Sequence, residues 1–303
     1  MPTETTAIVD LIVSSRSRRG QAEFQKCFSL LKELGITIPR AQRVSRERDL
    51  QLALEASIAA GAPVVAVGGG DGTMRIAAEV LAGRGPALGV LPLGTGNSFS
   101  RLIGIGHDVE KACHVISKGR CEWLDVGRAN GRTFLSFATI GVSTQIALSL
   151  DPMAKRRLGL ISYLRPTIEA FRRSKPFQVK VLSEDGARTI DALQVVVANG
   201  LRRIGPAPEP NGTGLTSGRL QGYVLASHDK AHLVRFFAAL ALNSLDAGEI
   251  MDTFEASQFS IETMPAKRVA IDGDVVLRTP VKFQASPERL LTVVPEEFEA
   301  EPG

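Results

Sequence analysis

The chain has 303 residues, of which 44% are hydrophobic and 22% are charged. This length is typical of two domains of ordinary size, and the composition is that of a globular protein rather than a disordered or fibrous one. The 36 Lys and Arg residues against 32 Asp and Glu give a net charge of +4, and aromatic residues make up only 5%. Both values argue against a nucleic-acid-binding protein, which would need a stronger basic surplus and more stacking surfaces.

The sequence also argues against a membrane-spanning or secreted protein. The longest wholly apolar run, Phe236–Leu242, is far shorter than a bilayer span, and Asp10 interrupts the first apolar stretch. The three cysteines, Cys27, Cys113 and Cys121, are odd in number and contain no C-x-x-C pair. We therefore expect a cytoplasmic protein whose cysteines are small buried residues rather than disulfide partners or zinc ligands.

The first 125 residues alternate between strand-like and helix-like patterns, which predicts an α/β domain with a parallel sheet. The predicted strands are Ala7–Val13, Ile36–Val44, Pro63–Val67 and Leu88–Leu91. The predicted helices are 24–34, Asp49–Ala60, Thr73–Leu81 and Asp108–Ser117. Gly35, Gly61 and Gly119 are the expected helix ends, and Asp108 is the expected N-cap of the last helix.

Beyond Trp123 the pattern changes to short strands with turn signals, which predicts a β-rich, β-sandwich-like second domain. The predicted strands are Thr133–Thr139, Phe177–Leu182, Leu193–Ala198, Leu220–Ala226, Phe254–Ile261, Val269–Ile271 and Val281–Ala285. Two helices, Arg157–Arg173 and Lys230–Leu242, and a long loop, Gly205–Gly218, are expected between them. The domains are therefore predicted to be 1–125 and 126–285, with segment 286–303 a candidate for returning to the first.

Two glycine-rich turns, each between a predicted strand and a predicted helix, carry the main functional signal. The first is Gly68–Thr73, and the second is Leu93–Asn97. Glycines there let backbone N–H groups approach an anion, and the N-terminus of the next helix adds a positive partial charge. One such turn is more often structural than functional. Two at the ends of neighbouring strands would form adjacent phosphate cradles, which favours phosphate binding.

The spacing of these turns differs from two common phosphate-binding motifs. No Gly-Lys-Ser/Thr follows the first turn, and Thr73 stands where the dinucleotide fingerprint requires a glycine. The turns resemble instead those of the diacylglycerol kinase catalytic-domain superfamily, in particular its bacterial soluble lipid-kinase branch, related to sphingosine and ceramide kinases. The resemblance covers nearly the whole chain and continues through Trp123–Gly127, Phe134–Gly141 and Ala270–Asp274. NAD kinases and phosphofructokinases share the first glycine motif alone.

The resemblance implies a role for particular residues. ATP would be held by Gly69–Arg75 and Gly94–Asn97, and Asp125 would join Asp71 around Mg²⁺ and the phosphates. Asp274 matches the carboxylate taken as the base that deprotonates the lipid hydroxyl, although Asp272-Gly273-Asp274 could equally be only a hairpin turn. The implied catalytic residues are Asp274 and Asp71. The implied nucleotide-binding residues are Ser45, Gly69, Gly70, Asp71, Gly72, Thr73, Gly94, Thr95, Gly96 and Asn97.

Several positions depart from the family pattern. Ser14-Ser15 stand where an Asn-Pro is common, and Ser98 stands where many members have an Asp. Ser217-Gly218-Arg219-Leu220 replaces an Asp-Gly-x-Leu element that is linked to a structural magnesium in some members, so no metal ligand is assigned there. These changes leave open weakened activity, an unusual acceptor, or a nucleotide-binding relative without chemistry.

The basic surplus is concentrated in Met153–Lys175, which carries seven basic residues and one acidic residue around a helically spaced apolar stripe. The remainder of the chain is therefore slightly acidic. Such a helix either contacts an anionic membrane or packs on the core with a solvated basic face. Because a lipid kinase must reach its substrate, the first reading predicts peripheral contact with the inner membrane face.

Taken with the resemblance, these features predict an ATP- and Mg²⁺-dependent lipid kinase. It would transfer the γ-phosphate to a lipid hydroxyl, diacylglycerol-like or sphingoid, with Asp274 as general base. The expected partner is a lipid substrate at an anionic membrane, and no nucleic acid is expected. Two alternatives remain at this point: an NAD-kinase-like small-molecule kinase, and a nucleotide- or lipid-binding regulator with weakened catalysis.

Overall fold

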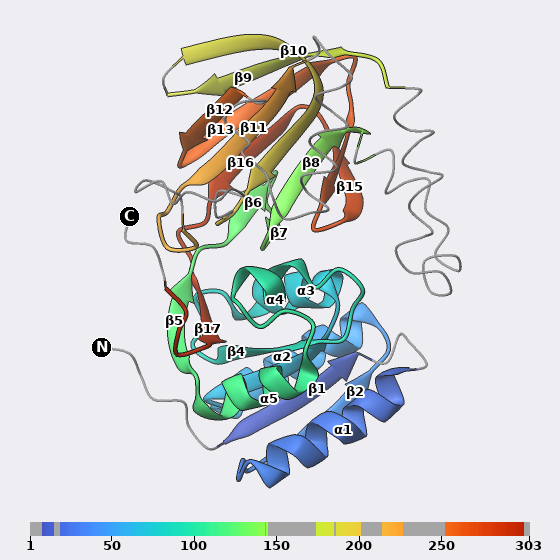
Figure 1. The fold of residues 1–303 in the computed structure, drawn as a ribbon, viewed down its shortest axis with the longest axis vertical. Coiled ribbons are helices and arrows are strands. Elements are labelled where there is room, and N and C mark those ends of the chain that lie inside the picture. The colour runs from blue at the N-terminus through green and yellow to red at the C-terminus, as the bar shows by residue number, and fades with distance from the viewer. Residues whose placement is uncertain are drawn as a thin grey trace. The chain divides into compact units, whose positions relative to one another are not determined.

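The structure is a computed structural model that describes residues 8–14, 19–142, 144, 174–184, 186–200, 214–226 and 252–299 (Figure 1). The chain divides into two compact units. The first unit contains residues 1–126 and 286–300, and the second contains residues 127–285 and 301–303. The boundaries predicted from the sequence fall after residues 125 and 285.

The first unit is built on a six-stranded sheet of order β2-β1-β3-β4-β17-β5. Its first four strands in this order are parallel, and all but the edge strand β2 are almost fully buried, as in a sheet covered on both faces. β17 lies parallel to β4, and β5 pairs with β17 in the antiparallel direction at the edge. The strands are β1 (Val9–Ser14), β2 (Ala41–Val44), β3 (Val64–Gly69), β4 (Ala87–Pro92), β5 (Arg120–Leu124) and β17 (Leu290–Val294).

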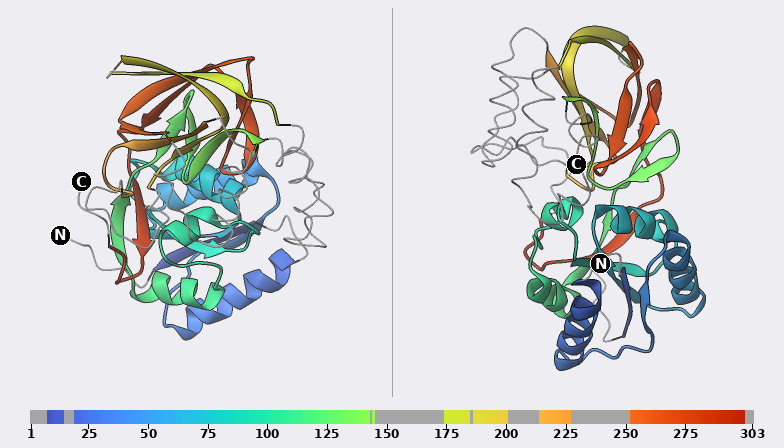
Figure 2. Two further views of the ribbon diagram at one scale, coloured as in Figure 1. Left: turned by 45° about the horizontal axis from the view of Figure 1, so that its top comes forward. Right: turned by 90° about the vertical axis from the view of Figure 1, so that its right-hand side faces the viewer.

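Helices cover both faces of this sheet. Figure 2 shows α1 and α5 together on one face and α2 and α3 together on the other, in agreement with their packing contacts. The helices are α1 (Arg19–Glu33), α2 (Glu47–Ala59), α3 (Asp71–Leu81), α4 (Ser98–Leu102) and α5 (Val109–Lys118). Asp108 is the N-cap of α5, because its carboxylate accepts the N–H groups of Glu110 and Lys111. The predicted α/β fold of the N-terminal half is thereby confirmed.

Two cysteines lie where α1 packs against α5. Cys27 and Cys113 are both buried, whereas Cys121 on β5 is half-buried. A hydrogen bond with Cys113, together with burial, raises the pKa of the Cys27 thiol. Cys27 therefore stays protonated at neutral pH and behaves as a small apolar side chain.

Some elements of the first unit differ from the prediction. The strand predicted over Ile36–Val44 contains only Ala41–Val44, since Pro39 has no N–H to donate to a ladder. β3 runs on through Gly68 and Gly69, and α3 begins at Asp71, two residues before the predicted start. β5 and β17 were not predicted as strands.

The second unit is an eleven-stranded antiparallel sheet whose buried apolar side chains form one hydrophobic core. The long strand β10 connects its two parts: residues Gly186–Ala192 pair with β9, and residues Gln194–Ala198 pair with β8 and β11. The strands are β6 (Gly127–Ala129), β7 (Arg132–Phe134), β8 (Phe137–Gly141), β9 (Phe177–Ser183), β10 (Gly186–Ala198), β11 (Leu220–Ala226), β12 (Asp252–Ala256), β13 (Gln258–Met264), β14 (Arg268–Ile271), β15 (Asp274–Arg278) and β16 (Val281–Ala285).

The core of this unit contains a row of aromatic rings. Phe283 lies between Phe134 and Phe259, with ring centroids 6.3 and 5.5 Å away, and all three side chains are buried. Burying each ring contributes about 1.5–3 kcal/mol. The predicted strand-rich second domain is confirmed, and its core explains the alternating apolar pattern of the sequence.

The second unit also corrects several predicted elements. The runs Thr133–Thr139 and Phe254–Ile261 are each divided into two strands, by Leu135-Ser136 and by Ser257. β6 and β15 were not predicted. The helices predicted over Arg157–Arg173 and Lys230–Leu242, and most of the basic segment 153–175, lie outside the described residues. None of the helices in the described part is long and apolar enough to cross a membrane.

Candidate functional site

The two glycine turns lie next to each other at the carboxyl edge of the parallel sheet. β3 and β4 are neighbours, and their register pairs Gly69 with Pro92, so both strands end at the same level. The N–H of Leu93 donates to the carbonyl oxygen of Gly69 at 3.0 Å, which ties the second turn to the first. The sequence predicts this adjacency from the two strand-turn-helix patterns.

The contact between the turns requires glycine on both sides. A Cβ atom on Gly94 would lie 2.4 Å from the Cα of Gly70, and one on Gly70 would lie 3.2 Å from the Cα of Gly94. The first distance is impossible for real atoms, and the obstacle is backbone that cannot rotate away. The glycines are therefore explained by the close approach of two loops, which brings their N–H groups together.

Asn97 holds the second turn from within. Its backbone is left-handed, with φ of 47°, and its side chain is buried. The side-chain oxygen accepts the N–H of Gly94 at 2.9 Å, and the amide nitrogen donates to the carbonyl oxygens of Pro92 and Gly94 at 3.3 and 3.0 Å. Asn97, which the resemblance assigns to nucleotide binding, thus acts on the shape of the turn.

Asp71 connects the first turn to the helix that follows the second. Its carboxylate accepts the N–H of Ser98, the first residue of α4, at 2.6 Å. A Cβ atom on Gly96 would lie 2.6 Å from the other carboxylate oxygen, so Gly96 is needed for this contact. The sequence identifies Asp71 as a site residue but does not indicate that it caps α4.

The turns present hydrogen-bond donors that the protein itself does not use. Within the described part of the chain, the N–H groups of Gly72, Thr95 and Gly96 have no acceptor. Thr95 and Gly96 are exposed, and Gly72 lies in the first turn of α3, whose N-terminus carries a positive partial charge. Three free donors at a helix N-terminus suit a phosphate group, so the residues present fit the phosphates of a nucleotide.

Ser45 follows β2 at the same edge of the sheet. β2 lies beside β1 in parallel, with Val44 paired to Ser14, and β1 lies beside β3. Ser45 is exposed there. Its position is compatible with nucleotide contact, two strands away from the first glycine turn.

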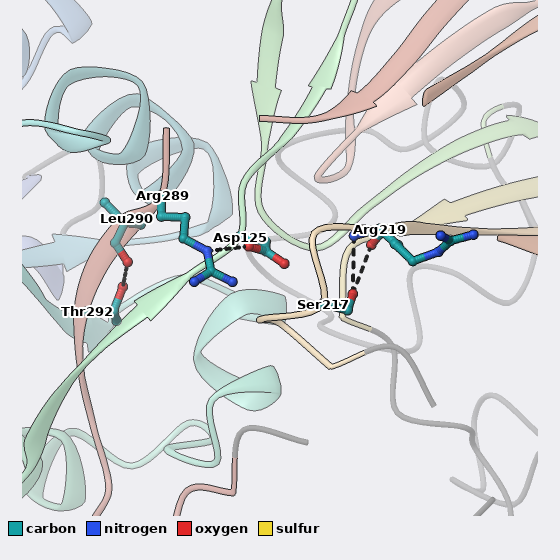
Figure 3. A network of polar contacts seen from close by, with 6 residues as sticks. All are labelled: Asp125, Ser217, Arg219, Arg289, Leu290 and Thr292. Atoms are coloured by element: carbon teal, nitrogen blue, oxygen red, sulfur yellow. Dashed lines mark hydrogen bonds and ion pairs between the residues drawn. The ribbon is translucent and has the colours of Figure 1, made fainter. Parts of the chain in front are cut away.

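Asp125 has a different environment from the one expected for a magnesium ligand. It is buried, and one carboxylate oxygen accepts the Nε–H of Arg289 at 2.8 Å (Figure 3). Arg289 directly precedes β17, so this ion pair anchors the returning C-terminal segment beside β5. The sequence does not predict this role of Arg289, because its partner Asp125 lies far away in the chain.

Ser217 lies in a tight turn before β11. Its hydroxyl accepts the N–H of Arg219 at 3.2 Å (Figure 3), and the Arg219 guanidinium pairs with Glu255 at 2.7 Å. In the described residues, no group of three or more His, Cys, Asp or Glu side chains is arranged to hold a metal ion. The turn is therefore organised by a serine and an ion pair.

The Asp272-Gly273 turn joins β14 to β15, and Asp274 is the first residue of β15. Asp272 and Gly273 both have positive φ, at 46° and 88°, as a two-residue type I′ hairpin requires. Asp274 is exposed immediately after the turn. The hairpin that the Asp-Gly pair favours is therefore present, and Asp274 as general base stays a prediction.

Asp272 anchors this hairpin. Its buried carboxylate accepts three backbone N–H groups, from Leu135 at 2.8 Å, Ser136 at 2.9 Å and Phe137 at 3.3 Å. Asn199 supports the same loop by donating from its side chain to the carbonyl oxygen of Leu135 at 3.1 Å. Asp272 and Asn199 were not among the predicted site residues. The signal for Asp272 was the Asp-Gly turn itself, in which Asp is a favoured left-handed residue.

Gly94→Ala tests the contact between the turns. We expect it to weaken ATP binding by about tenfold or more, because the new methyl group forces the turns apart. Isothermal titration calorimetry with ATP measures this. Gly85→Ala is the matched control: it places alanine at φ of 104° but meets nothing within 4 Å. Wild-type affinity in Gly94→Ala would show that the turns do not bind the nucleotide together.

Known proteins resemble this chain in sequence. A family model of the diacylglycerol kinase catalytic domain matches residues 10–129. A Synechocystis sp. protein without an assigned function is 26% identical over 271 residues, which cover 88% of this chain and 62% of that protein. "Probable lipid kinase YegS-like" of Klebsiella pneumoniae is 31% identical over 200 residues, covering 65% of this chain and 67% of that protein. The chain thus spans about two thirds of the length of these relatives.

Solved structures share the fold over nearly the whole chain. The crystal structure of a diacylglycerol kinase from Bacillus anthracis superposes with a TM-score of 0.75 and 24% identity, covering 96% of this chain and 98% of that one. The fold of the α/β unit and the fold of the antiparallel second unit are therefore both found in that protein. With the family match over the glycine turns and the YegS-like relative, the chain belongs to the diacylglycerol kinase catalytic-domain superfamily.

Proposed function

We propose that the protein is an ATP-dependent kinase that phosphorylates the hydroxyl group of a lipid. The observation that carries the proposal is the pair of interlocked glycine turns, Gly69–Thr73 and Gly94–Asn97, with free N–H groups at one sheet edge. Phosphoryl transfer depends mainly on positioning and charge neutralisation, and these turns supply fixed donors for phosphate oxygens. Family membership supports the lipid as acceptor.

Asp274 is the proposed general base. It is an exposed carboxylate held on a hairpin that Asp272 fixes to the β7–β8 loop. The carboxylate accepts the proton of the lipid hydroxyl, the lipid oxygen bonds to the γ-phosphorus, and the bond from that phosphorus to the bridging oxygen breaks to release ADP. The buried Asp272 carboxylate restricts the motion of the hairpin, while Asp274 itself stays exposed and accessible to the acceptor.

Asp71 is the residue that would hold Mg²⁺, together with the phosphate oxygens of the nucleotide. Magnesium in kinases is commonly bound by one or two carboxylates plus phosphate oxygens, so a single carboxylate beside the second glycine turn fits it. When bound, the ion neutralises charge that develops on the phosphate oxygens. Asp125 is less suited, because it is buried against Arg289. Ser98 contributes its N–H to Asp71 and thereby fixes the carboxylate in place.

The acceptor would be presented at an anionic membrane surface. The basic segment 153–175 supports this contact through its positive charge. Each basic residue near an anionic membrane surface contributes about 1 kcal/mol to binding. A diacylglycerol-like lipid has one free hydroxyl, and a sphingoid base has a primary hydroxyl beside a secondary one, so either offers the acceptor group that the reaction needs. Because ATP is supplied in the cytoplasm, the proposed reaction would take place at the cytoplasmic face of the membrane.

Incubation with γ-labelled ATP and Mg²⁺ tests the proposal, with total lipid extract in one arm and a panel of soluble alcohols in the other. We expect label in a lipid, resolved by thin-layer chromatography, and none in the soluble panel. Label only in soluble acceptors would identify a small-molecule kinase instead. ATP binding without any labelled product would identify a regulator, a role that the serines at Ser98 and Ser217 favour because both stand where a carboxylate is common.

A further inference from the structure

Four connections of the second unit meet at one end of its sheet, where β9 and β16 flank β13 (Figure 1). The N–H of Thr279, between β15 and β16, donates to the carbonyl oxygen of Lys267, between β13 and β14, at 2.9 Å. In the β6–β7 turn, the side chain of Asn130 donates to the carbonyl oxygen of Pro280 at 3.2 Å. The start of β9 joins them, because the Lys267 ammonium group lies 4.8 Å from the centre of the Phe177 ring. We call this end the basic tip, and it contains residues 129–132, 174–178, 263–268 and 278–282.

The basic tip carries charge of one sign. Its side chains are exposed except that of Lys267 among the charged ones, which is half-buried. At the opposite ends of β9 and β15, the exposed Glu184 and Asp274 are acidic instead. The charges of the second unit are therefore separated along its strands, although the whole chain has a net charge of only +4. The four segments of the tip contain no acidic residue and six basic ones, which are Arg132, Lys175, Lys267, Arg268, Arg278 and Lys282.

Two arginines of the tip repel each other. Arg268 on β14 and Arg278 on β15 lie directly opposite each other in the register, an arrangement that destabilises a strand pair. In the described part of the chain, neither guanidinium has a carboxylate partner. Asp191 on β10 and Glu262 on β13 flank the tip, opposite residues of β9. A bound anion would remove the repulsion and use the donors of both guanidinium groups.

Met264 adds an apolar side chain to the same surface. It is 73% exposed, the most exposed of the large apolar side chains in the described part of the chain. Pro265-Ala266, directly after it, are exposed as well. This connection is held in place, because the N–H of Lys267 donates to the hydroxyl oxygens of Thr263 at 3.1 Å and Thr279 at 2.9 Å. The tip thus presents a fixed apolar side chain surrounded by basic ones, a combination typical of surfaces that contact a membrane.

We propose that the basic tip docks on an anionic membrane, with Met264 at the boundary of headgroups and acyl chains and the basic side chains on lipid phosphates. The proposal rests on the proposed function, in which the acceptor is a lipid in such a membrane. A soluble polyanion would match only the charge of the tip, whereas an anionic bilayer matches both the charge and the apolar side chain. Asp274 lies four residues from Arg278 along β15, about 13 Å in an extended strand, so the docked tip leaves the Asp272–Asp274 hairpin uncovered.

Flotation with vesicles tests the proposal on the full chain. Wild type should bind vesicles of equal parts phosphatidylglycerol and phosphatidylcholine, should not bind pure phosphatidylcholine, and should bind less at high salt. Arg268→Gln combined with Arg278→Gln should lower the partition coefficient by about 30-fold, the effect of two basic residues near an anionic surface. Met264→Ser should lower it by about fivefold or more, because the apolar contact with the bilayer is lost.

Arg188→Gln combined with Lys118→Gln is the matched control, since it removes the same charge from exposed positions outside the tip. It should change the partition coefficient by less than about twofold. All of these variants should bind ATP as wild type does, and the Tm of the double arginine variant should be unchanged or higher, because a repulsion is removed.

Wild-type partitioning in the double arginine variant and in Met264→Ser would overturn the proposal, and so would a wild type that binds no anionic vesicles. An equal loss in the control would show that total charge, and not the tip, decides binding. Tighter binding to heparin than to vesicles, unaffected by Met264→Ser, would assign the tip to a soluble polyanion and overturn the proposal as well.

Phosphorylation of lipids dispersed in neutral detergent micelles separates the tip from the proposed function, because micelles offer no anionic surface. Labelled lipid in micelles without vesicle binding would remove the tip and leave the kinase. Vesicle binding that depends on the tip, with no lipid labelled in either setting, would support the tip and remove the kinase.

Discussion

Asp274→Asn is expected to lower the rate of phosphoryl transfer by about 10²- to 10⁴-fold, the usual contribution of a general base. The amide cannot accept the proton of the acceptor hydroxyl, although it keeps the size and polarity of the carboxylate. Because Asp274 is exposed and the hairpin is held by Asp272, the Tm should stay within a degree or so of wild type. The measurement is kcat with the lipid that the labelling experiment identifies.

Asp191→Asn is the matched control for this variant. Asp191 is also an exposed aspartate at a strand position in the second unit, opposite Gln178 on β9, and it should keep wild-type kcat. Binding of ATP should be unchanged in both variants, since neither residue belongs to the glycine turns. An Asp274→Asn enzyme with wild-type kcat would remove Asp274 from the mechanism.

Asp272→Ala is expected to reduce the free energy of unfolding by about 3 kcal/mol or more. The change leaves the N–H groups of Leu135, Ser136 and Phe137 without their acceptor in a buried place, and each unpaired group costs about 1–3 kcal/mol, although such costs do not simply add. Asp272→Asn keeps one acceptor oxygen and should lie between alanine and wild type. Urea denaturation followed by circular dichroism measures the difference.

The same two variants separate the anchor from the base. Asp272→Asn should lose kcat beyond its loss of folded protein, because the hairpin that carries Asp274 becomes less fixed. Asp191→Ala, a second substitution at the control position, should change the free energy of unfolding by less than about 0.5 kcal/mol. If Asp272→Ala unfolds at the wild-type urea concentration, the three N–H groups find other acceptors and the anchoring role is wrong.

The elements that the sequence predicts well are those defined by local signals. Val64–Val67 is an unbroken run of small and β-branched apolar residues, which can only be a buried strand or helix, and the following glycines decide for the strand. Gly35 and Gly61 adopt φ of 81° and 68° after α1 and α2, as glycines that end helices commonly do. Asp108 bonds to two N–H groups at the start of α5, as predicted.

The elements that the sequence does not predict depend on distant partners. β17 contains five residues, and its place between β4 and β5 is set by pairing with segments about two hundred and one hundred and seventy residues earlier. β6 has only Gly127–Ala129 and is a strand because β16 and β7 pair with it. A short run of this kind has no period of its own, so only tertiary contacts decide its conformation.

The candidate site shows the same division. Residue types and strand ends predict that the two glycine turns meet, because parallel strands end at one edge. They do not predict the direction of a side chain: Asn97 turns into its own loop, Asp125 pairs with Arg289, and Asp71 caps α4. The sequence identifies which groups are present, and the contacts show which of them remain available to a ligand.

The return of the C-terminal segment to the first unit has a consequence for how the chain is made. The two crossings between the units run together, since the N–H of Ser286 donates to the carbonyl oxygen of Val126 at 2.7 Å. During synthesis β4 and β5 emerge from the ribosome long before Leu290–Val294, which fills the gap between them. The sheet that holds the glycine turns is therefore completed only after the strands of the second unit have been synthesised, and a chain that stopped before Leu290 would leave β4 and β5 with unpaired edges.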